Sequence, residues 1–228
     1  MSPKKVKVTK HMMKEDKLVT TTFKFTEYVQ KHSKEFLFAG GGLVVVILIV
    51  LFLISSNKSR SQKAADLLGK ARVELESGEF QAATADLQTI LRSYNGTDAA
   101  QEALYLLGNS YYYGKEYDQA LRYFQEFVSK YSKSDPFFLS GAYSGIGDCY
   151  VQKKEFALAA ESYLRAADKI KDDLIIPNLL LSAAQSYSYA NQPDKAKELY
   201  ERIITKYPNS KVVPQARMEL AELQAQKG

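Results

Sequence analysis

The most distinct hydrophobic pattern in the chain is one uninterrupted apolar segment. Residues 36–57 carry no charged side chain, and every residue from Leu43 to Ile54 is Leu, Val, Ile or Phe. A helix of this length extends over roughly 30 Å, which matches the hydrocarbon core of a bilayer. A cleaved signal peptide fits less well, because a long basic stretch precedes the segment and Ser55-Ser56-Asn57 is a poor cleavage site. The pattern predicts a transmembrane helix over residues 36–57, in contact with the lipid bilayer.

Beyond residue 63 the hydrophobic pattern repeats. Small residues recur at intervals of 37, 39, 37 and 37, namely Ala71, Gly108, Gly147, Ala184 and Ala221. Twelve residues after each of the first four stands an alanine, and four residues later a bulky side chain: Leu87, Phe124, Tyr163 and Tyr200. Each unit predicts two antiparallel helices that cross at their small residues. Because one hairpin cannot bury its apolar face alone, the units are expected to stack.

The polar segments between these patterns divide the chain. We expect a basic tail over 1–35, a linker over 58–63 and a repeat domain over 64–228. Within the tail, Asp16 is a candidate N-cap for an amphipathic helix from Lys17 to Lys34. The predicted hairpins cover about 64–97, 98–135, 136–173 and 174–209, and a capping helix covers 210–228.

Three helix starts in the repeat domain carry recognisable capping signals. Asp98 with Gln101 resembles a capping box. Asp135 precedes a proline, which favours a helix that begins at Pro136. Ser210 is a candidate cap for a last helix from about Lys211 to Gln226.

The positive charge of the chain belongs to its tail. Residues 1–35 hold nine Lys and four acidic residues, whereas residues 58–228 hold equal numbers of basic and acidic residues. The repeat domain is therefore not expected to bind nucleic acid, which would require basic residues on one face. A basic tail ahead of an apolar helix favours a cytoplasmic N-terminus, with the repeat domain across the membrane. The basic residues close to the two ends of the helix are nearly balanced, so the opposite topology stays open.

The residue types that carry catalysis are scarce. Both histidines precede the apolar segment, and Cys149 is the only cysteine. The repeat domain therefore offers no acid–base, nucleophilic or metal-ligating constellation. We expect no enzyme activity, no metal, no cofactor and no small-molecule substrate.

The repeat columns resemble a known family. Leu107-Gly108, Tyr111, Tyr117, Ala120 and Phe124 look like a tetratricopeptide repeat almost column for column, and Gly147 to Tyr163 does so too. The first and fourth hairpins depart from the pattern at Glu74, Leu87 and Pro193. The resemblance covers about residues 64–226 and implies an all-α fold, in which a right-handed superhelix of four hairpins and a capping helix follows the transmembrane helix.

In repeats of this family the ligand groove is lined by three positions on the first helix of each hairpin. Carried over to this sequence, those positions are Leu68, Arg72, Leu75, Tyr105, Asn109, Tyr112, Ser144, Asp148, Val151, Leu181, Gln185 and Ser188. The mixture is close to neutral and rich in hydroxyl and amide groups. Such a surface is suited to polypeptide segments of varied sequence.

The order of parts is similar to that of the YfgM-like family. This chain has the same layout: a basic tail that contains Lys14-Glu15-Asp16-Lys17, then one anchor, and then a repeat domain. The resemblance implies an ancillary subunit of the SecYEG translocon and a partner in the periplasmic chaperone network, located in the bacterial inner membrane. The leading hypothesis is thus a membrane-tethered adaptor that binds protein segments near a translocation or envelope-assembly machine. Two alternatives are a scaffold subunit of a cell-envelope complex and an organelle receptor that faces the cytosol.

Overall fold

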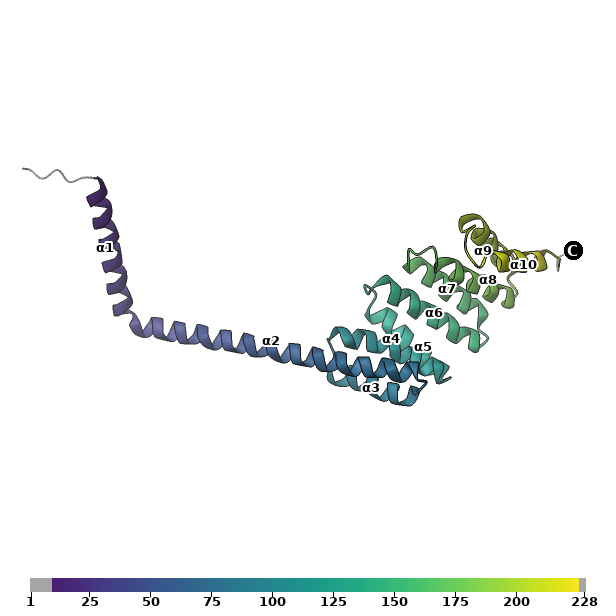
Figure 1. The fold of residues 1–228 in the computed structure, drawn as a ribbon, viewed down its shortest axis with the longest axis horizontal. Helices are drawn as coiled ribbons and strands as arrows, with labels where there is room; N and C mark the ends of the chain where they lie inside the picture. Colours follow the sequence, from purple (N-terminus) through teal and green to yellow (C-terminus); the bar gives the residue numbers. More distant parts are fainter. Residues whose placement is uncertain (1–9, 226–228) are drawn as a thin grey trace, which may run out of the picture. The chain divides into compact units, whose positions relative to one another are not determined.

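The protein is described by a computed structural model over residues 10–225. Residues 1–9 of the predicted tail and residues 226–228 of the predicted capping helix lie outside this part, as do the side chains of residues 10–16, 18, 36, 39 and 40. All regular structure in the described part is helical (Figure 1). The chain divides into two compact units, residues 1–58 and 59–228, and each is considered by itself.

The first unit contains α1 (Lys10–Lys31) and the beginning of α2 (Ser33–Glu76). The predicted start at Asp16 is wrong, because α1 begins before it and Asp16 lies inside the helix. No proline or glycine interrupts residues 10–16, and Met, Lys and Glu all favour helix. The first helix also ends before Lys34, which belongs to α2.

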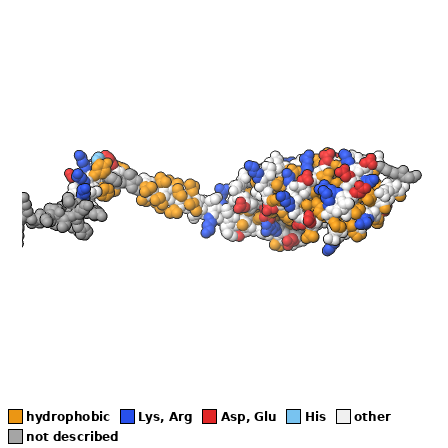
Figure 2. Space-filling model, turned by 90° about the horizontal axis from the view of Figure 1, so that it is seen from above, with side chains coloured by type: hydrophobic (Ala, Val, Ile, Leu, Met, Phe, Trp, Pro, Cys, Tyr) orange, Lys and Arg blue, Asp and Glu red, His pale blue; other side chains and the backbone are white. Residues whose placement is uncertain are grey.

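The apolar segment lies inside α2. Among the described residues, α2 is the one helix that is long and apolar enough to cross a membrane. The described side chains from Leu43 to Ile54 are all exposed in this unit, and Figure 2 shows them as a band of apolar side chains. Length and composition alone support a membrane span here.

Residues 58–63, predicted to form a linker, are also part of α2. Ser, Lys, Arg and Gln are compatible with helix, and the segment contains neither proline nor glycine. Polar composition alone therefore did not end the helix, and the segment is helical rather than extended.

The second unit is a stack of helical hairpins. Its helices after α2 are α3 (Phe80–Ser93), α4 (Asp98–Tyr113), α5 (Tyr117–Lys130), α6 (Pro136–Gln152), α7 (Phe156–Lys169), α8 (Ile176–Tyr189), α9 (Pro193–Lys206) and α10 (Val213–Ala225). From α3 onward each helix packs on the next, and α4 also packs on α6, so first helices of neighbouring hairpins lie side by side (Figure 1). The predicted all-α stack of repeats is confirmed.

Small residues mark the places where the helices approach. Ala71, Gly108, Gly147 and Ala184 are buried, as the spacing predicted. A Cβ added to Gly108 would lie 2.7 Å from the Phe124 ring, so this helix crossing tolerates only hydrogen there. Ala221 is exposed instead, because α10 has no second helix after it among the described residues.

The turns inside the four hairpins share one backbone conformation. Gly78, Lys115, Lys154 and Asn191 all have positive φ, between 56° and 78°. This region favours glycine, so the non-glycine residues are held there by the paired helices on either side.

The predicted caps are partly confirmed. Asp135 accepts a hydrogen bond from the Phe137 N–H at 2.8 Å, and α6 begins with Pro136. Helix α4 is capped by Thr97, which accepts from the Ala100 N–H, because Asp98 already lies in the helix. The last helix begins at Val213 rather than near Lys211, and the Val213 N–H donates to the backbone carbonyl of Ser210, not to the side chain that was the predicted cap.

Candidate peptide-binding face

The twelve predicted groove positions lie on the first helices α2, α4, α6 and α8. Leu68 and Leu181 are only 6% and 7% exposed and belong to the hydrophobic core. Leucine at these two positions packs inward, so neither belongs to a binding surface. The other ten are exposed or half-buried, and we call them the first-helix face: Arg72, Leu75, Tyr105, Asn109, Tyr112, Ser144, Asp148, Val151, Gln185 and Ser188.

At the N-terminal end of this face an ion pair joins two neighbouring first helices. The Arg72 guanidinium of α2 donates from Nε to the Glu102 carboxylate of α4 at 2.9 Å. Glu102 is the less exposed of the two side chains. A ligand that uses either charge must compete with this pair.

In the centre of the face, Tyr105 is largely a packing residue. Its ring lies within 6.0 Å of the rings of Phe124, Phe127 and Phe138. A Cβ added to Gly141 in α6 would lie 2.6 Å from the Tyr105 hydroxyl. Burial raises the pKa of Tyr105, and the neighbouring Asn109 side chain only partly offsets that effect, so the hydroxyl stays protonated.

Tyr112 differs from Tyr105 in its surroundings. It is half-buried, and its ring lies 5.7 Å from Tyr113 and 5.6 Å from Tyr117, both at the end of the same hairpin. Burial raises the pKa of Tyr112, and the Gln152 side chain of α6 only partly offsets that effect. Part of the ring faces solvent, which makes Tyr112 the best-placed aromatic contact on this face.

Asp148 is the carboxylate at the centre of the face. It accepts a hydrogen bond from the Tyr163 hydroxyl of α7 at 2.6 Å. Burial raises the pKa of the Asp148 carboxyl, and the Tyr163 bond only partly offsets that effect. Burial also raises the pKa of Tyr163, so this hydroxyl remains a donor.

At the C-terminal end, one carboxylate joins three helices. Glu219 of α10 accepts hydrogen bonds from Gln185 of α8 at 2.7 Å, from Gln215 at 2.9 Å and from the Tyr200 hydroxyl of α9. Ser188 donates to the Ala184 carbonyl of its own helix. The remaining members of the face, Leu75, Ser144 and Val151, are half-buried.

Sequence reasoning did not find the partners Glu102, Tyr163 and Glu219. A weak signal was present, because Arg72–Glu102 and Gln185–Glu219 are complementary polar pairs separated by 30 and 34 residues. These separations are slightly shorter than the repeat interval, as expected for side chains that reach from one first helix to the next. The arrangement offers hydrogen-bonding groups and a half-exposed ring, which are the means of binding a polypeptide.

Comparison with known proteins identifies the type of repeat. Residues 102–134 and 179–210, the second and fourth hairpins, match the model of the tetratricopeptide repeat. The fourth hairpin matches in spite of Pro193 at its turn. The chain is also 28% identical over 160 residues to tetratricopeptide repeat protein 8 of Caenorhabditis elegans, a match that covers 64% of this chain. The chain spans only 30% of that relative's length.

Solved structures share the fold. A tetratricopeptide repeat protein from Parabacteroides merdae superposes with a TM-score of 0.60 at 14% identity, covering 72% of this chain and 61% of that chain. The crystal structure of MamA gives 0.56 at 21% identity, covering 69% of this chain and 84% of that chain. Tetratricopeptide repeats generally form scaffolds rather than catalytic sites. The chain therefore carries tetratricopeptide repeats over residues 102–134 and 179–210, and repeats of this kind mediate protein–protein interactions.

Proposed function

We propose that the protein is a membrane-tethered adaptor that binds polypeptide segments or partner subunits through its first-helix face. The observation that carries the proposal is the row of half-buried polar and aromatic side chains on consecutive first helices, with Tyr112 as the most accessible ring. Tetratricopeptide repeats supply the general role, protein binding.

The proposed anchor is the apolar part of α2, inserted in the inner membrane of a bacterium. The tail would be cytoplasmic and the repeat domain periplasmic, because the excess lysines lie before the apolar segment. Alkaline phosphatase and a fluorescent protein, each fused to the C-terminus, test this topology. Active phosphatase with a dark fluorescent protein supports it, and the reverse result would establish the cytosol-facing receptor instead.

The face itself is tested with a photoreactive amino acid at Tyr112 in native membranes. The matched control carries the same amino acid at Glu126, which is exposed on the second helix α5. We expect protein adducts at residue 112 and few at residue 126. Adducts confined to residue 126 would contradict the proposal and favour a scaffold that binds through its second helices.

Substitutions on the first-helix face must leave the aromatic packing around Tyr105 intact, so that a loss of binding is not caused by unfolding. Tyr112→Ala removes a half-exposed ring and should weaken adduct formation from a second probe at Ser144. Tyr105→Phe removes only the hydroxyl and keeps the aromatic packing. We therefore expect a large loss for Tyr112→Ala and a small one for Tyr105→Phe.

We also propose that the partner belongs to a protein-translocation or envelope-assembly machine, in a role close to that of a chaperone. The proposal follows from the shared layout of tail, anchor and repeat domain. Identification of the residue-112 adducts by mass spectrometry decides it. Adducts with translocon subunits or exported chains support the proposal, whereas adducts with cytosolic proteins alone would reject it.

A further inference from the structure

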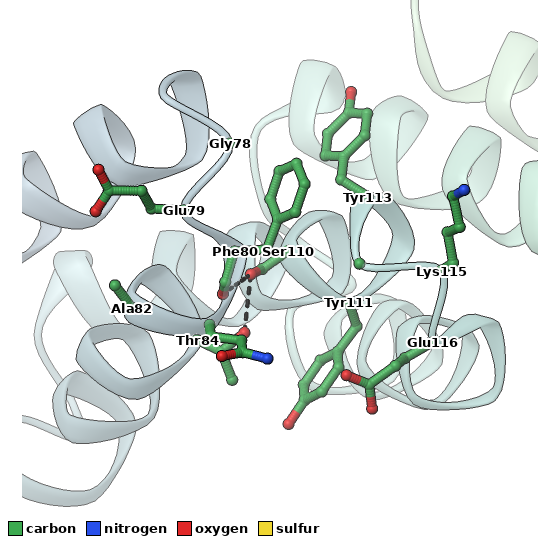
Figure 3. A pocket seen from close by; sticks show the side chains of 12 residues that line it. Gly78, Glu79, Phe80, Ala82, Thr84, Ser110, Tyr111, Tyr113, Lys115 and Glu116 are labelled. Atoms are coloured by element: carbon green, nitrogen blue, oxygen red, sulfur yellow. Dashed lines mark hydrogen bonds between the residues drawn. The ribbon is translucent and has the colours of Figure 1, made fainter.

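A notch opens between the turns of the first two hairpins (Figure 3). It has a volume of about 830 Å³ and is lined by residues 78–82, Thr84, Ser110, Tyr111 and residues 113–116. A smaller notch of about 380 Å³ lies between the turns of the second and third hairpins, lined by residues 115–119 and Lys153. The two are equivalent by repeat position, because residues 78–82 correspond to 115–119 and Gly114 corresponds to Lys153.

The smaller notch is occupied by a lysine of the chain itself. Lys153, at the end of the third hairpin's first helix, donates from Nζ to the Asp118 carboxylate of α5 at 2.5 Å. Its Nζ also lies 3.9 Å from the Glu155 carboxylate. One ammonium group thus links two neighbouring turns and narrows the space between them.

The larger notch lacks this lysine. Gly114 stands at the position of Lys153, and Gln81 stands at the position of Asp118. The carboxylate that corresponds to Glu155 is retained as Glu116, and it makes no ion pair among the described residues. The space that an ammonium group occupies one repeat later is open, and two acceptors remain beside it.

Aromatic rings supply the rest of the lining. Phe80 and Tyr113 stack with their centroids 5.8 Å apart at one end, and Figure 3 shows Tyr111 and Glu116 at the other. Lys115 also lines the notch, but its side chain points away from the Glu116 carboxylate. Aromatic rings can pack against the aliphatic stem of a basic side chain, while an acceptor beside them can bind its charged end.

We propose that this notch binds a lysine side chain of a protein partner. The stem would lie against Phe80 and Tyr113, and the ammonium group would reach Gln81 and Glu116, as Lys153 reaches Asp118 and Glu155. The proposal rests on the proposed function only in that the partner is a protein. It adds a second contact, at the turns of the hairpins rather than on the first-helix face.

The test uses the full chain in lipid nanodiscs with 3-fluorotyrosine at residue 113, observed by fluorine NMR. The probe is the peptide acetyl-Ala-Ala-Lys-Ala-Ala-amide, and the control peptide has norleucine in place of lysine. We expect a saturable shift of the Tyr113 signal with the lysine peptide and none with the control. An equal shift with the norleucine peptide would overturn the proposal.

Three variants sharpen the test. The double variant Gln81→Asp/Gly114→Lys introduces the equivalents of Asp118 and Lys153 into the larger notch. It should abolish the peptide-induced shift of the Tyr113 signal. The backbone permits this change, because Gly114 (φ −70°, ψ 0°) and Lys153 (φ −83°, ψ −2°) share a conformation. Glu116→Gln should weaken peptide binding about threefold, as for a solvent-exposed ion pair. The matched variant Glu126→Gln should leave binding unchanged.

The reverse experiment creates a site. With fluorotyrosine at residue 117, Lys153→Ala opens the second notch and should bring a lysine-dependent shift that the parent chain lacks. A shift that persists in the Gln81→Asp/Gly114→Lys variant would overturn the proposal. The titration does not depend on Tyr112 adducts, so the notch and the first-helix face are tested independently.

Discussion

The ring of Phe124 in α5 lies directly against the backbone of Gly145 in α6. A Cβ at residue 145 would lie 2.6 Å from Phe124 Cε2. The other side of the ring meets Gly108 in α4, where a Cβ would lie 2.7 Å from Cδ1. One fully buried ring therefore fills the space between the first helices of two hairpins, and both helices provide a glycine to admit it.

This packing predicts that Gly145→Ala destabilises the stack. The added methyl overlaps the Phe124 ring, and overpacking of this kind costs about 1–3 kcal/mol. Chemical unfolding followed by circular dichroism measures the change. The control is Gly69→Ala in α2, where an added Cβ meets nothing within 4 Å. It should stabilise the helix by up to about 1 kcal/mol, and a loss at residue 69 equal to that at residue 145 would contradict the explanation.

Glu74 offers a stabilising substitution. The residue is only 9% exposed, and its Oε1 pairs with Lys70 Nζ at 3.2 Å, while its Oε2 has no hydrogen-bond partner among the described residues. A buried, half-satisfied carboxylate is costly, so we expect Glu74→Leu to raise the free energy of unfolding by about 1 kcal/mol. Glu76→Leu, at an exposed position of the same helix, should give no such gain in the same unfolding measurement.

Asp148 makes stability depend on pH. Its folded-state pKa lies above the ordinary value of 3.8, chiefly because of burial. The folded chain then binds the proton more tightly than the unfolded chain. The free energy of unfolding therefore falls as pH rises from the ordinary pKa of the carboxyl through its raised folded-state pKa. Asp148→Asn keeps an acceptor for the Tyr163 hydroxyl and removes the buried charge.

We expect Asp148→Asn to be more stable than the parent at pH 7. The difference should shrink as pH approaches 4, because the parent carboxyl then becomes protonated. Urea unfolding at both pH values checks this. A difference that stays constant between them would show that the carboxylate charge is not the cause.

Cys149 should be almost inert in the folded chain. Burial raises the pKa of its thiol to about 12. At pH 8 only about one thiol in ten thousand would be ionised, and the thiolate is the reactive form. Labelling with a chromogenic disulfide should therefore be slow in buffer and fast in concentrated urea. Equal rates in both would place the thiol at the surface.

The order and spacing of the hairpins could be predicted because each depends on a local pattern. Ala71, Gly108, Gly147 and Ala184 stand at regular intervals, and all four are buried where helices cross. Helix ends were harder, since they depend on which side chain reaches a free N–H. Thr97 caps α4, although Asp98 beside it is an equally good candidate by residue type.

The binding face could be predicted only in outline. The repeat register locates the first helices, but burial of Leu68 and Leu181 depends on contacts with other helices. The partners of Asp148 and Gln185 were missed for the same reason, because Tyr163 and Glu219 come from different helices. The larger notch, in contrast, can be predicted from the sequence. Alignment of the turns shows that Gly114 stands where the next repeat has Lys153.

The turns with positive φ also provide a molecular ruler. Gly78, Lys115, Lys154 and Asn191 are exposed, and they occur at intervals of 37, 39 and 37 residues, one in each hairpin. Fluorophores attached to two of these turns would mark known steps along the stack. The distance between them, measured by energy transfer, would report directly whether the repeats tighten or extend when a partner is captured.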